Sequence, residues 1–378
     1  MRHLIFCLLF ITLLDVAAQA VDPSATKKTK NLYRFLEQSA QLGMMFGHQD
    51  DAAYGIGWRE IHGESDVKRL VGTYPAIFGW DLGEIDSTDN LDDVKFDLMR
   101  DRIKMIYKMG GINTISWHMR NPLNGASSWD KTETIKELLP GGSAHQAYID
   151  KLEAFTSFIK KCNTLFTKVP IIFRPYHEHN GDWFWWGKGY CTEEEYIALW
   201  RFTVEYLRDE KGLHNLIYAF SPDRSRMDLS KGAASYLYAY PGDEYVDIIG
   251  FDNYWDVGLK WNKASRDQQQ KELIESLKLV ASVAREKNKV FALSETGNET
   301  LNIDDWYMQS LLDPIKASGT NPAWVLVWRN FDESHFYVPY EGQKNAPGFI
   351  EFEKDDYTFF LKDISNPYRK SPKKHAIE

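Results

Sequence analysis

Two glutamates stand where this sequence could place a pair of reacting carboxylates. Glu178 follows the apolar run 169–176, and Glu295 lies at the end of the apolar run 290–296. Hydrolysis of a glycosidic bond needs one carboxylic acid that protonates the leaving oxygen and a second carboxylate that attacks the sugar or activates water. The two glutamates are far apart in the chain, so only a fold that brings distant strand ends together can combine them.

The local sequences around both glutamates are rich in groups that bind sugars. The stretch 174–187 reads RPYHEHNGDWFWWG, in which an imidazole precedes Glu178 and a dense aromatic loop follows it. Such rings can exclude water and stack on a pyranose, although some of them could instead plug the core. The stretch 250–255 reads GFDNYW and ends a further apolar run. The hydroxyl of Tyr254 could therefore hydrogen-bond Glu295 and hold it ionised.

Short apolar runs that alternate with amphipathic stretches indicate how these residues are positioned. Amphipathic patterns with a period of three to four residues predict helices over 96–109, 149–162, 193–208 and 271–287. Continuous apolar strands between helices are typical of a parallel sheet that is buried on both faces. We predict eight strands, over 44–48, 76–81, 113–118, 169–176, 216–221, 246–252, 290–296 and 325–329.

Eight such units predict an α/β fold of the (β/α)8 TIM barrel type. A doubly wound open sheet would place a glycine-rich phosphate loop after its first strand, and residues 48–51 offer none. Barrels of this type carry their chemistry at the carboxyl ends of the strands. Nearly every predicted strand ends in residues that can bind or titrate: His48, Asp81, His118, His177 with Glu178, Asp223, Tyr254, Glu295, and Trp328 with Arg329.

The first twenty residues have the pattern of a signal peptide. A basic start precedes the apolar run 4–14, and Ala18-Gln19-Ala20 supplies a small-x-small cleavage pattern. We therefore expect export from a bacterium to the periplasm or the medium, cleavage near Ala20, and a single catalytic domain over 21–378. A glycan acceptor sequence at Asn298-Glu299-Thr300 follows the strand of Glu295, where a glycan would obstruct the cleft, which favours a bacterial route.

Charge and cysteine content limit the partners of this chain. Its net charge of −9 argues against nucleic acid and against an anionic membrane surface. Cys162 and Cys191 belong to no cluster with ligand spacing, so we expect neither a metal nor a cofactor, and the sequence leaves open whether the two cysteines pair. We expect a soluble monomer that acts on a carbohydrate.

In these motifs the sequence resembles the β-mannanases of glycoside hydrolase family 26, in the retaining barrel clan. The resemblance spans the chain after the signal peptide. It is carried by Arg-Pro-Tyr-His-Glu at 174–178 with its continuation to Gly187, Gly-Phe-Asp-Asn-Tyr at 250–254, Ser-Glu-Thr-Gly at 294–297, and Val-Trp-Arg-Asn at 327–330.

The resemblance implies a role for each of these positions. It implies Glu178 as the catalytic acid/base, Glu295 as the nucleophile and Tyr254 as the partner of the nucleophile. It also implies substrate contacts: His177 at the reacting sugar, Trp328 beneath it, Arg329 at the next sugar on the non-reducing side, and His118 and Trp183 as further lining. In such a site the charge of Glu295 is expected to raise the pKa of Glu178 and keep it protonated.

The substrate implied by the resemblance is β-1,4-mannan, galactomannan or manno-oligosaccharide, cleaved internally or with release of mannobiose. The same family architecture also serves β-1,3-xylan and mixed-linkage β-glucan, so a xylanase or a glucanase is the alternative. Mannose differs from glucose in its axial 2-hydroxyl, and His177 lies where that hydroxyl would be read, which favours mannan. A sugar-binding protein without catalysis is disfavoured because both glutamates are present, and a phosphate-binding isomerase because residues 294–298 and 328–332 lack a glycine-rich site.

Overall fold

The structure is a computed structural model that describes residues 19–370 of the chain. The predicted signal peptide therefore lies almost entirely outside the described residues. Between residues 19 and 370, no helix has the length and apolar character that a membrane crossing requires.

Eight parallel strands close into a barrel, which confirms the predicted fold class. Strand β1 pairs with β4 on one side and with β10 on the other, and this second pairing closes the ring. A short strand β11 (Thr358–Phe359) pairs with β1. The chain after β1 forms a small antiparallel hairpin of β2 (Tyr54–Gly55) and β3 (Trp58–Arg59). The barrel strands are β1 (Met44–Gln49), β4 (Ile77–Asp81), β5 (Ile112–Ser116), β6 (Ile171–Arg174), β7 (Leu216–Phe220), β8 (Ile248–Asn253), β9 (Val290–Thr296) and β10 (Trp324–Val327).

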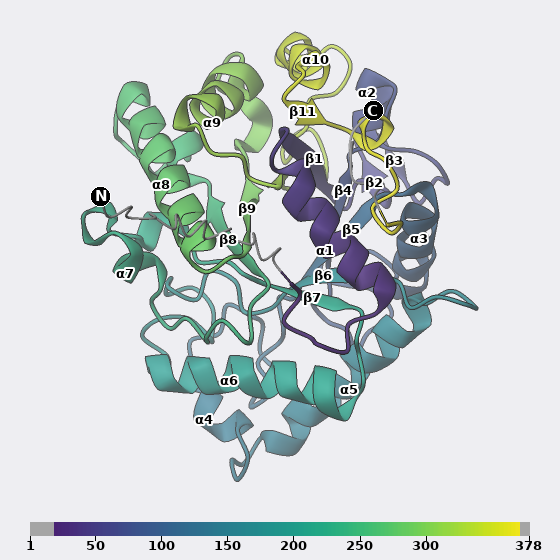
Figure 1. The fold of residues 1–378 in the computed structure, drawn as a ribbon, viewed down its shortest axis with the longest axis vertical. Coiled ribbons are helices and arrows are strands. Elements are labelled where there is room, and N and C mark those ends of the chain that lie inside the picture. The colour runs from purple at the N-terminus through teal and green to yellow at the C-terminus, as the bar shows by residue number, and fades with distance from the viewer. Residues whose placement is uncertain (1–18, 371–378) are drawn as a thin grey trace, which may run out of the picture.

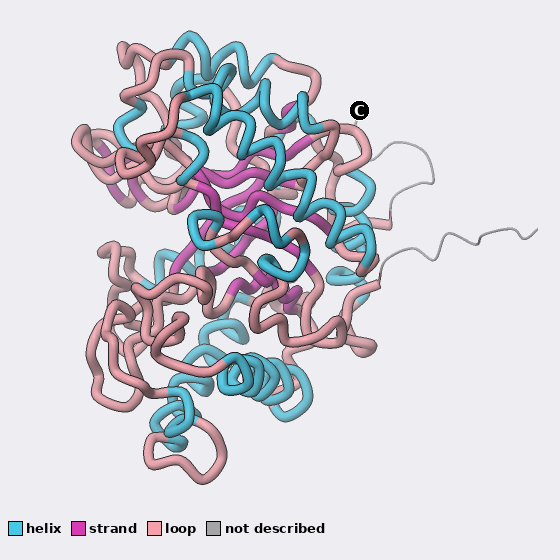
Figure 2. Tube along the Cα trace, turned by 90° about the vertical axis from the view of Figure 1, so that its left-hand side faces the viewer, coloured by secondary structure: helices cyan, strands magenta, loops and turns pink. Residues whose placement is uncertain are grey.

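Helices surround this ring and long loops gather on one side of it (Figures 1 and 2). Helix α3 has the predicted bounds, whereas α8 begins earlier because Ser265 caps it by accepting a hydrogen bond from the Gln268 amide. Helix α6 passes into a π-helical turn at Tyr206–Glu210. The α-helices are α1 (Lys27–Ser39), α2 (Asp66–Val71), α3 (Phe96–Met109), α4 (Ile135–Leu138), α5 (His145–Cys162), α6 (Glu193–Glu205), α7 (Ala233–Tyr236), α8 (Arg266–Glu286), α9 (Asp313–Ser318) and α10 (Ala346–Lys354).

The side chains that point into the barrel are apolar near the amino-terminal ends of the strands and polar near the carboxyl ends. Inward-facing residues such as Ile172, Ile217 and Ile248 pack with α1, which covers the amino-terminal end of the barrel. Because strand side chains alternate between faces, the inward positions further along β6 and β8 are Arg174 and Asp252. Buried charged groups therefore concentrate at the carboxyl ends of the strands, where the long loops begin.

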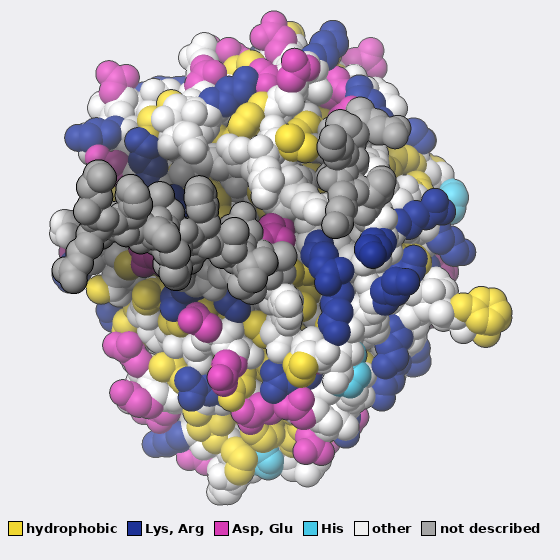
Figure 3. Space-filling model, viewed as in Figure 1, with side chains coloured by type: hydrophobic (Ala, Val, Ile, Leu, Met, Phe, Trp, Pro, Cys, Tyr) yellow, Lys and Arg dark blue, Asp and Glu magenta, His cyan; other side chains and the backbone are white. Residues whose placement is uncertain are grey.

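The face that α1 covers is a mixed polar surface (Figure 3). Lysine and arginine side chains gather on its right-hand side, although the whole chain is acidic. The loop between α5 and β6 carries Phe166, whose side chain is 91% exposed. This end of the barrel is separated by the strands from the residues that the sequence singles out.

Candidate active site

The Glu295 carboxylate lies between a guanidinium and a phenol at the carboxyl end of the barrel. Its Oε1 accepts a hydrogen bond of 2.8 Å from the Tyr254 hydroxyl, as the sequence predicted. Its Oε2 is ion-paired with the Arg174 guanidinium. Burial and the neighbouring charge of Glu295 raise the pKa of Tyr254 well above its usual value, so the phenol stays protonated and acts as a hydrogen-bond donor. These two contacts aim the carboxylate and stabilise its charge.

A β-bulge turns Glu295 into the barrel. On β9 the inward positions of the simple alternation are Ala292 and Ser294, which would direct Glu295 outward. The register between β8 and β9 shifts here, because Phe251 faces Leu293 but Asp252 faces Glu295. One extra residue on a strand re-aims the side chains that follow. Ser294 and Glu295 therefore both reach the interior.

Arg174 and Asp252 form the floor beneath Glu295. The Arg174 Nη1 lies 2.6 Å from the Asp252 Oδ2, and the Ser221 hydroxyl donates to the Asp252 Oδ1 at 2.5 Å. Burial and the charge of Glu295 raise the pKa of Asp252, while its ion pair with Arg174 and the hydrogen bond from Ser221 lower it. Arg174 and Asp252 are almost completely buried, so loss of Arg174 leaves two buried carboxylates without their cation.

Glu178 is held in the cleft by an unusual backbone turn. Tyr176 and Glu178 both have positive φ, at 46° and 54°, a conformation that costs on the order of 1–3 kcal/mol for a residue with a side chain. The Glu178 amide donates to the Ser221 carbonyl at 2.7 Å, and the Tyr176 hydroxyl contacts the Tyr148 hydroxyl at 2.7 Å among the outer helices. These anchors hold the turn, and the indole of Trp183 donates to the Glu178 Oε2 at 2.7 Å.

The surroundings of Glu178 favour its protonated form. Burial is the largest cause, followed by the negative charges of Asp223, Asp252 and Glu295, and together they raise the pKa of Glu178 well above its usual value. The sequence anticipated the effect of Glu295 but not that burial and Asp223 exceed it. One carboxyl is thus kept as an acid beside a carboxylate that is paired with a cation, which suits acid and nucleophile roles.

Two histidines line the same cleft. Burial alone would lower the pKa of His118, but the Asp81 carboxylate, 2.8 Å from its Nδ1, raises it. Burial and the charges of Arg174 and His118 lower the pKa of His177 well below its usual value, so this ring is neutral. The rings of His118 and His177 meet edge to face at 4.7 Å, and the Nδ1 of His177 is buried with no hydrogen-bond partner among residues 19–370. His177 therefore has hydrogen-bonding capacity that the described part of the chain does not use.

Trp328 and Arg329 follow β10 and point in different directions. The half-buried Trp328 ring meets the His118 ring edge to face at 6.2 Å. Arg329 instead pairs with Asp92 at 3.0 Å and donates to the Tyr54 hydroxyl at 3.3 Å. Its guanidinium is thus fixed between the loops that follow β1 and β4.

Several site residues were not singled out from the sequence. Arg174 and Asp252 belong to the sequence motifs but were not predicted as site residues. The signal for them is a charge inside an apolar parallel strand, because such a charge needs a buried partner. Trp129, in the loop after β5, stacks on His118 at 5.4 Å and is half exposed. No feature of the sequence distinguishes it from other loop tryptophans.

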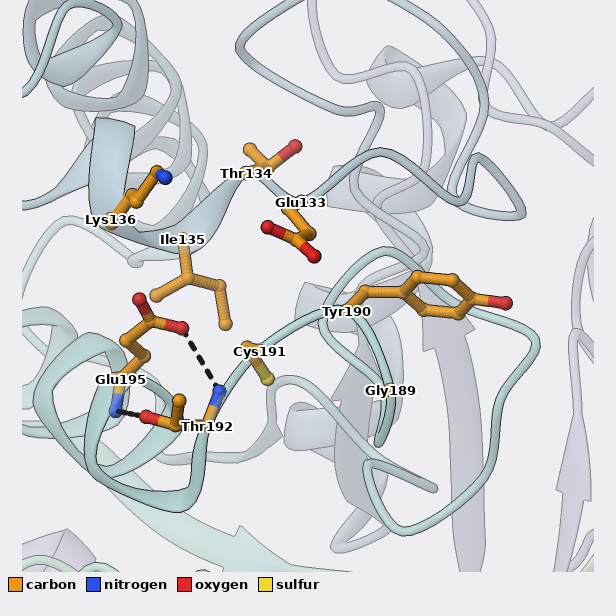
Figure 4. Close-up of a pocket in the computed structure, with 9 residues that line it drawn as sticks. All are labelled: Glu133, Thr134, Ile135, Lys136, Gly189, Tyr190, Cys191, Thr192 and Glu195. Atoms are coloured by element: carbon orange, nitrogen blue, oxygen red, sulfur yellow. Dashed lines mark hydrogen bonds between the residues drawn. The ribbon is translucent and has the colours of Figure 1, made fainter.

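A separate cavity of about 300 Å³ lies outside this cleft, between α4 and the start of α6 (Figure 4). Two of its polar groups, Thr192 and Glu195, cap α6 by hydrogen-bonding each other's backbone amides. Cys191 also lines it, and Cys191 and Cys162 are both free thiols. Over residues 19–370, no group of histidine, cysteine or acidic side chains is arranged to hold a metal ion.

Comparison with known proteins agrees with this geometry. The model of glycosyl hydrolase family 26 matches residues 21–335. A mannan endo-1,4-beta-mannosidase from Bifidobacterium adolescentis is 30% identical over 93% of this chain, which spans 36% of that protein, and one from Bacillus subtilis is 28% identical over 87% of this chain and 89% of its own length.

Solved structures of the family superpose closely. A family 26 beta-mannanase from Bacteroides ovatus has a TM-score of 0.84 at 36% identity and covers 93% of this chain and 99% of its own. An endo-beta-1,4-mannanase from Cellulomonas fimi has a TM-score of 0.84 at 32% identity, with 96% and 81% covered. The resemblance read from the motifs is therefore confirmed: the chain belongs to glycosyl hydrolase family 26, whose members are enzymes that hydrolyse glycosidic bonds.

Proposed function

We propose that the protein is a retaining β-1,4-mannanase that hydrolyses mannan, galactomannan or manno-oligosaccharides, internally or with release of mannobiose. The observation that carries the mechanism is the unequal environment of the two glutamates. Arg174 and Tyr254 contact the two oxygens of Glu295 and orient its side chain, whereas burial and the acidic neighbours of Glu178 raise the pKa of Glu178 and keep its proton in place.

The proposed reaction has two steps. The Glu295 carboxylate attacks the anomeric carbon, and the proton of Glu178 passes to the glycosidic oxygen as the bond to the leaving chain breaks. Glu295 is then a neutral ester, so its charge no longer raises the pKa of Glu178 and Glu178 can serve as a base. Water then attacks the anomeric carbon of this ester and gives a proton to Glu178, and the bond from the anomeric carbon to Glu295 breaks, which releases Glu295 as a carboxylate.

The remaining residues are assigned to the substrate. We place Trp328 beneath the reacting sugar, His118, His177 and Trp183 around it, and Arg329 at the next sugar on the non-reducing side. A neutral imidazole such as that of His177 can donate or accept a hydrogen bond with a sugar hydroxyl. The names of the related proteins support mannan over β-1,3-xylan or mixed-linkage β-glucan.

Two experiments test this proposal. Proton NMR of the first products should show the β-anomer before mutarotation, and early α-anomer would refute double displacement. A product time course on linear mannan, galactomannan, β-1,3-xylan and mixed-linkage β-glucan should give turnover of the two mannans and distinguish internal cleavage from mannobiose release. Turnover of only β-1,3-xylan or mixed-linkage β-glucan would show that mannan is not the substrate.

Export remains a proposal that rests on the amino-terminal pattern. We propose that the signal peptide is removed near Ala20 and that the mature enzyme begins at Val21, in the periplasm or the medium. The intact mass of protein secreted by its own host should correspond to a start at Val21. A chain that keeps its first twenty residues, or that carries a lipid, would refute this.

Replacing Arg329 should weaken activity on substrates long enough to reach it more than on short ones. An arginine fork can donate to two sugar hydroxyls, and binding at a remote sugar is used at the reacting centre. Arg329→Ala should lower kcat/KM on mannotetraose at least about 10-fold, roughly 1.4 kcal/mol. An aryl monomannoside cannot reach this position and should be much less affected.

Stability must be separated from binding in this variant, because Arg329→Ala leaves the buried Asp92 unpaired. Partial unfolding lowers activity on every substrate equally, so the ratio between long and short substrates isolates the binding effect. Asp92→Asn, which keeps the guanidinium but removes the ion pair, is the matched control. Equal losses on both substrates in Arg329→Ala would show that its assigned place is wrong.

The negative charge of Asp223 can be tested through the pH dependence of activity. Glu178 acts as an acid while protonated, so activity is present below its pKa and is lost as the pH rises through it. Asp223, whose own pKa burial raises to about 6, is ionised above that pH and raises the pKa of Glu178. Asp223→Asn removes this charge and should move the high-pH limb of kcat/KM to lower pH.

Asp182→Asn supplies the control for this prediction, because it removes an equal charge from the exposed rim, where solvent screens it. The charges of Asp252, Glu295 and Arg174 around Glu178 remain in both variants. A high-pH limb that stays in place or moves to higher pH in Asp223→Asn would contradict the role of its charge.

A further inference from the structure

An aromatic cavity of about 510 Å³ adjoins the acid/base on the half of the barrel away from the partners of Arg329. Arg329 contacts Tyr54 and Asp92 in the loops after β1 and β4. The cavity is instead formed mainly by the loops after β6, β7 and β8, with Trp183, Asp223, Arg226, Tyr254, Leu259 and Trp261 among its lining residues. None of the roles assigned above occupies its outer part.

The contact between Trp183 and Glu178 tells which part of the substrate this cavity meets. The acid gives its proton to the oxygen that leaves with the departing chain. Trp183 lines the cavity and its indole donates to the Glu178 Oε2. A chain that passes Glu178 on the leaving side therefore runs into the cavity, first along Trp183 and then towards Trp261.

Trp261 is an exposed tryptophan on an ordered turn. Its side chain is 66% exposed. The neighbouring Asn262 is buried, donates to the Trp255 carbonyl at 2.9 Å and accepts from the Ala264 amide at 2.9 Å. These two bonds hold the backbone on either side of Trp261. The position of the indole is therefore fixed by the turn, although its ring is not packed in the core. A large aromatic face held in water in this way suits stacking on a sugar.

The opposite wall supplies polar groups. The Asp223 Oδ1 accepts from the Ser225 amide at 2.8 Å, while no side chain or amide of the described residues donates to its Oδ2. The guanidinium of Arg226 lies 5.3 Å from the Trp183 ring and pairs with Asp182 at 2.6 Å. Aromatic faces with a few acceptors and donors opposite them are what a hexose with several hydroxyls requires.

We propose that Trp261 stacks on the second sugar of the leaving chain, so that the enzyme grips at least two sugars on the reducing side of the cut. This inference rests on the proposed function, because it takes the acid/base role of Glu178 as given. The ligand is a β-linked hexose chain. Its binding at this position contributes only to the first step, since the leaving chain departs before water attacks.

The test compares two substrates in the variant Trp261→Ala. An aryl β-mannobioside places only its phenol on the leaving side, whereas mannopentaose can place two or more sugars there. We expect the ratio of kcat/KM on mannopentaose to kcat/KM on the aryl mannobioside to fall about 10-fold. In water enriched in oxygen-18, the cleavage of mannopentaose should shift away from the bond that leaves two or three sugars on the reducing side.

Phe166→Ala is the matched control, because it removes an even more exposed ring from the other end of the barrel and should leave the ratio unchanged. Trp261 is too exposed for its loss to unfold the protein, which a melting curve can verify. If wild-type protein turns over mannopentaose but Trp261→Ala keeps its ratio and cleavage pattern, the inference is overturned. If wild-type protein turns over no mannan substrate, the proposed function itself fails.

Discussion

Glu295→Ala is expected to abolish turnover of every substrate, with kcat falling by more than about 10⁴-fold on both mannan and activated aryl glycosides. The first step is common to all of these substrates and requires a nucleophile, so a better leaving group cannot compensate. Initial rates on mannan and on an aryl mannobioside measure the two losses. Glu295→Gln keeps the size of the side chain but replaces the nucleophilic oxygen, and should be equally inactive.

Folding of the Glu295 variants must be checked, since Arg174 loses one of its two carboxylate partners. Asp252 still pairs with the guanidinium, so a folded barrel is expected with a lower melting temperature. Glu299→Ala is the control for loss of a nearby glutamate, because Glu299 is half exposed and pairs with His335 instead. Substantial turnover of the aryl glycoside by a folded Glu295→Ala would refute the nucleophile role.

Glu178→Ala is expected to discriminate between substrates. Mannan has a poor leaving group that needs a proton, so its turnover should fall about 10²- to 10⁴-fold. An aryl mannobioside with an activated phenol leaves without that proton, so its first step should persist and the glycosyl enzyme should accumulate. Azide needs no general base and should accelerate turnover by attacking this intermediate and forming a glycosyl azide.

The measurement is a burst experiment on the aryl substrate with and without azide, together with steady-state rates on mannan. Trp183 loses its acceptor in this variant, but the indole remains half-buried against its aromatic neighbours. Similar losses on both substrates, without rescue by azide, would remove Glu178 from its acid/base role.

The barrel itself could be predicted because its determinants are local. Each of the eight predicted strands overlaps an observed one, and α3 has the predicted bounds. Short, continuous apolar runs that alternate with amphipathic helices are typical of strands in a sheet covered on both faces, so length and order along the chain identify the strands. The same argument located the polar residues at the strand ends, since parallel strands in a closed ring all end at one rim.

The ends of several elements depended on more distant contacts. The predicted strand 169–176 ends at Arg174, because the positive φ of Tyr176 and Glu178 breaks the ladder and turns the chain into the cleft. The predicted helix 271–287 begins five residues earlier, at Arg266, because Ser265 caps it. A single sequence states the preference for strand or helix but not the anchor that holds a turn in a costly conformation.

The sequence by itself determined the order of the strands and which residue types stand at their ends, because burial of apolar runs and alternation of side chains act between neighbours in the chain. Only the tertiary structure decided how those residues differ from one another. A bulge in β9 turns Glu295 inward, where it pairs with Arg174 on β6. Burial, together with the charges of Asp223, Asp252 and Glu295, raises the pKa of Glu178. Desolvation and Coulomb interactions depend on distances across the barrel, and these exist only once the ring has closed.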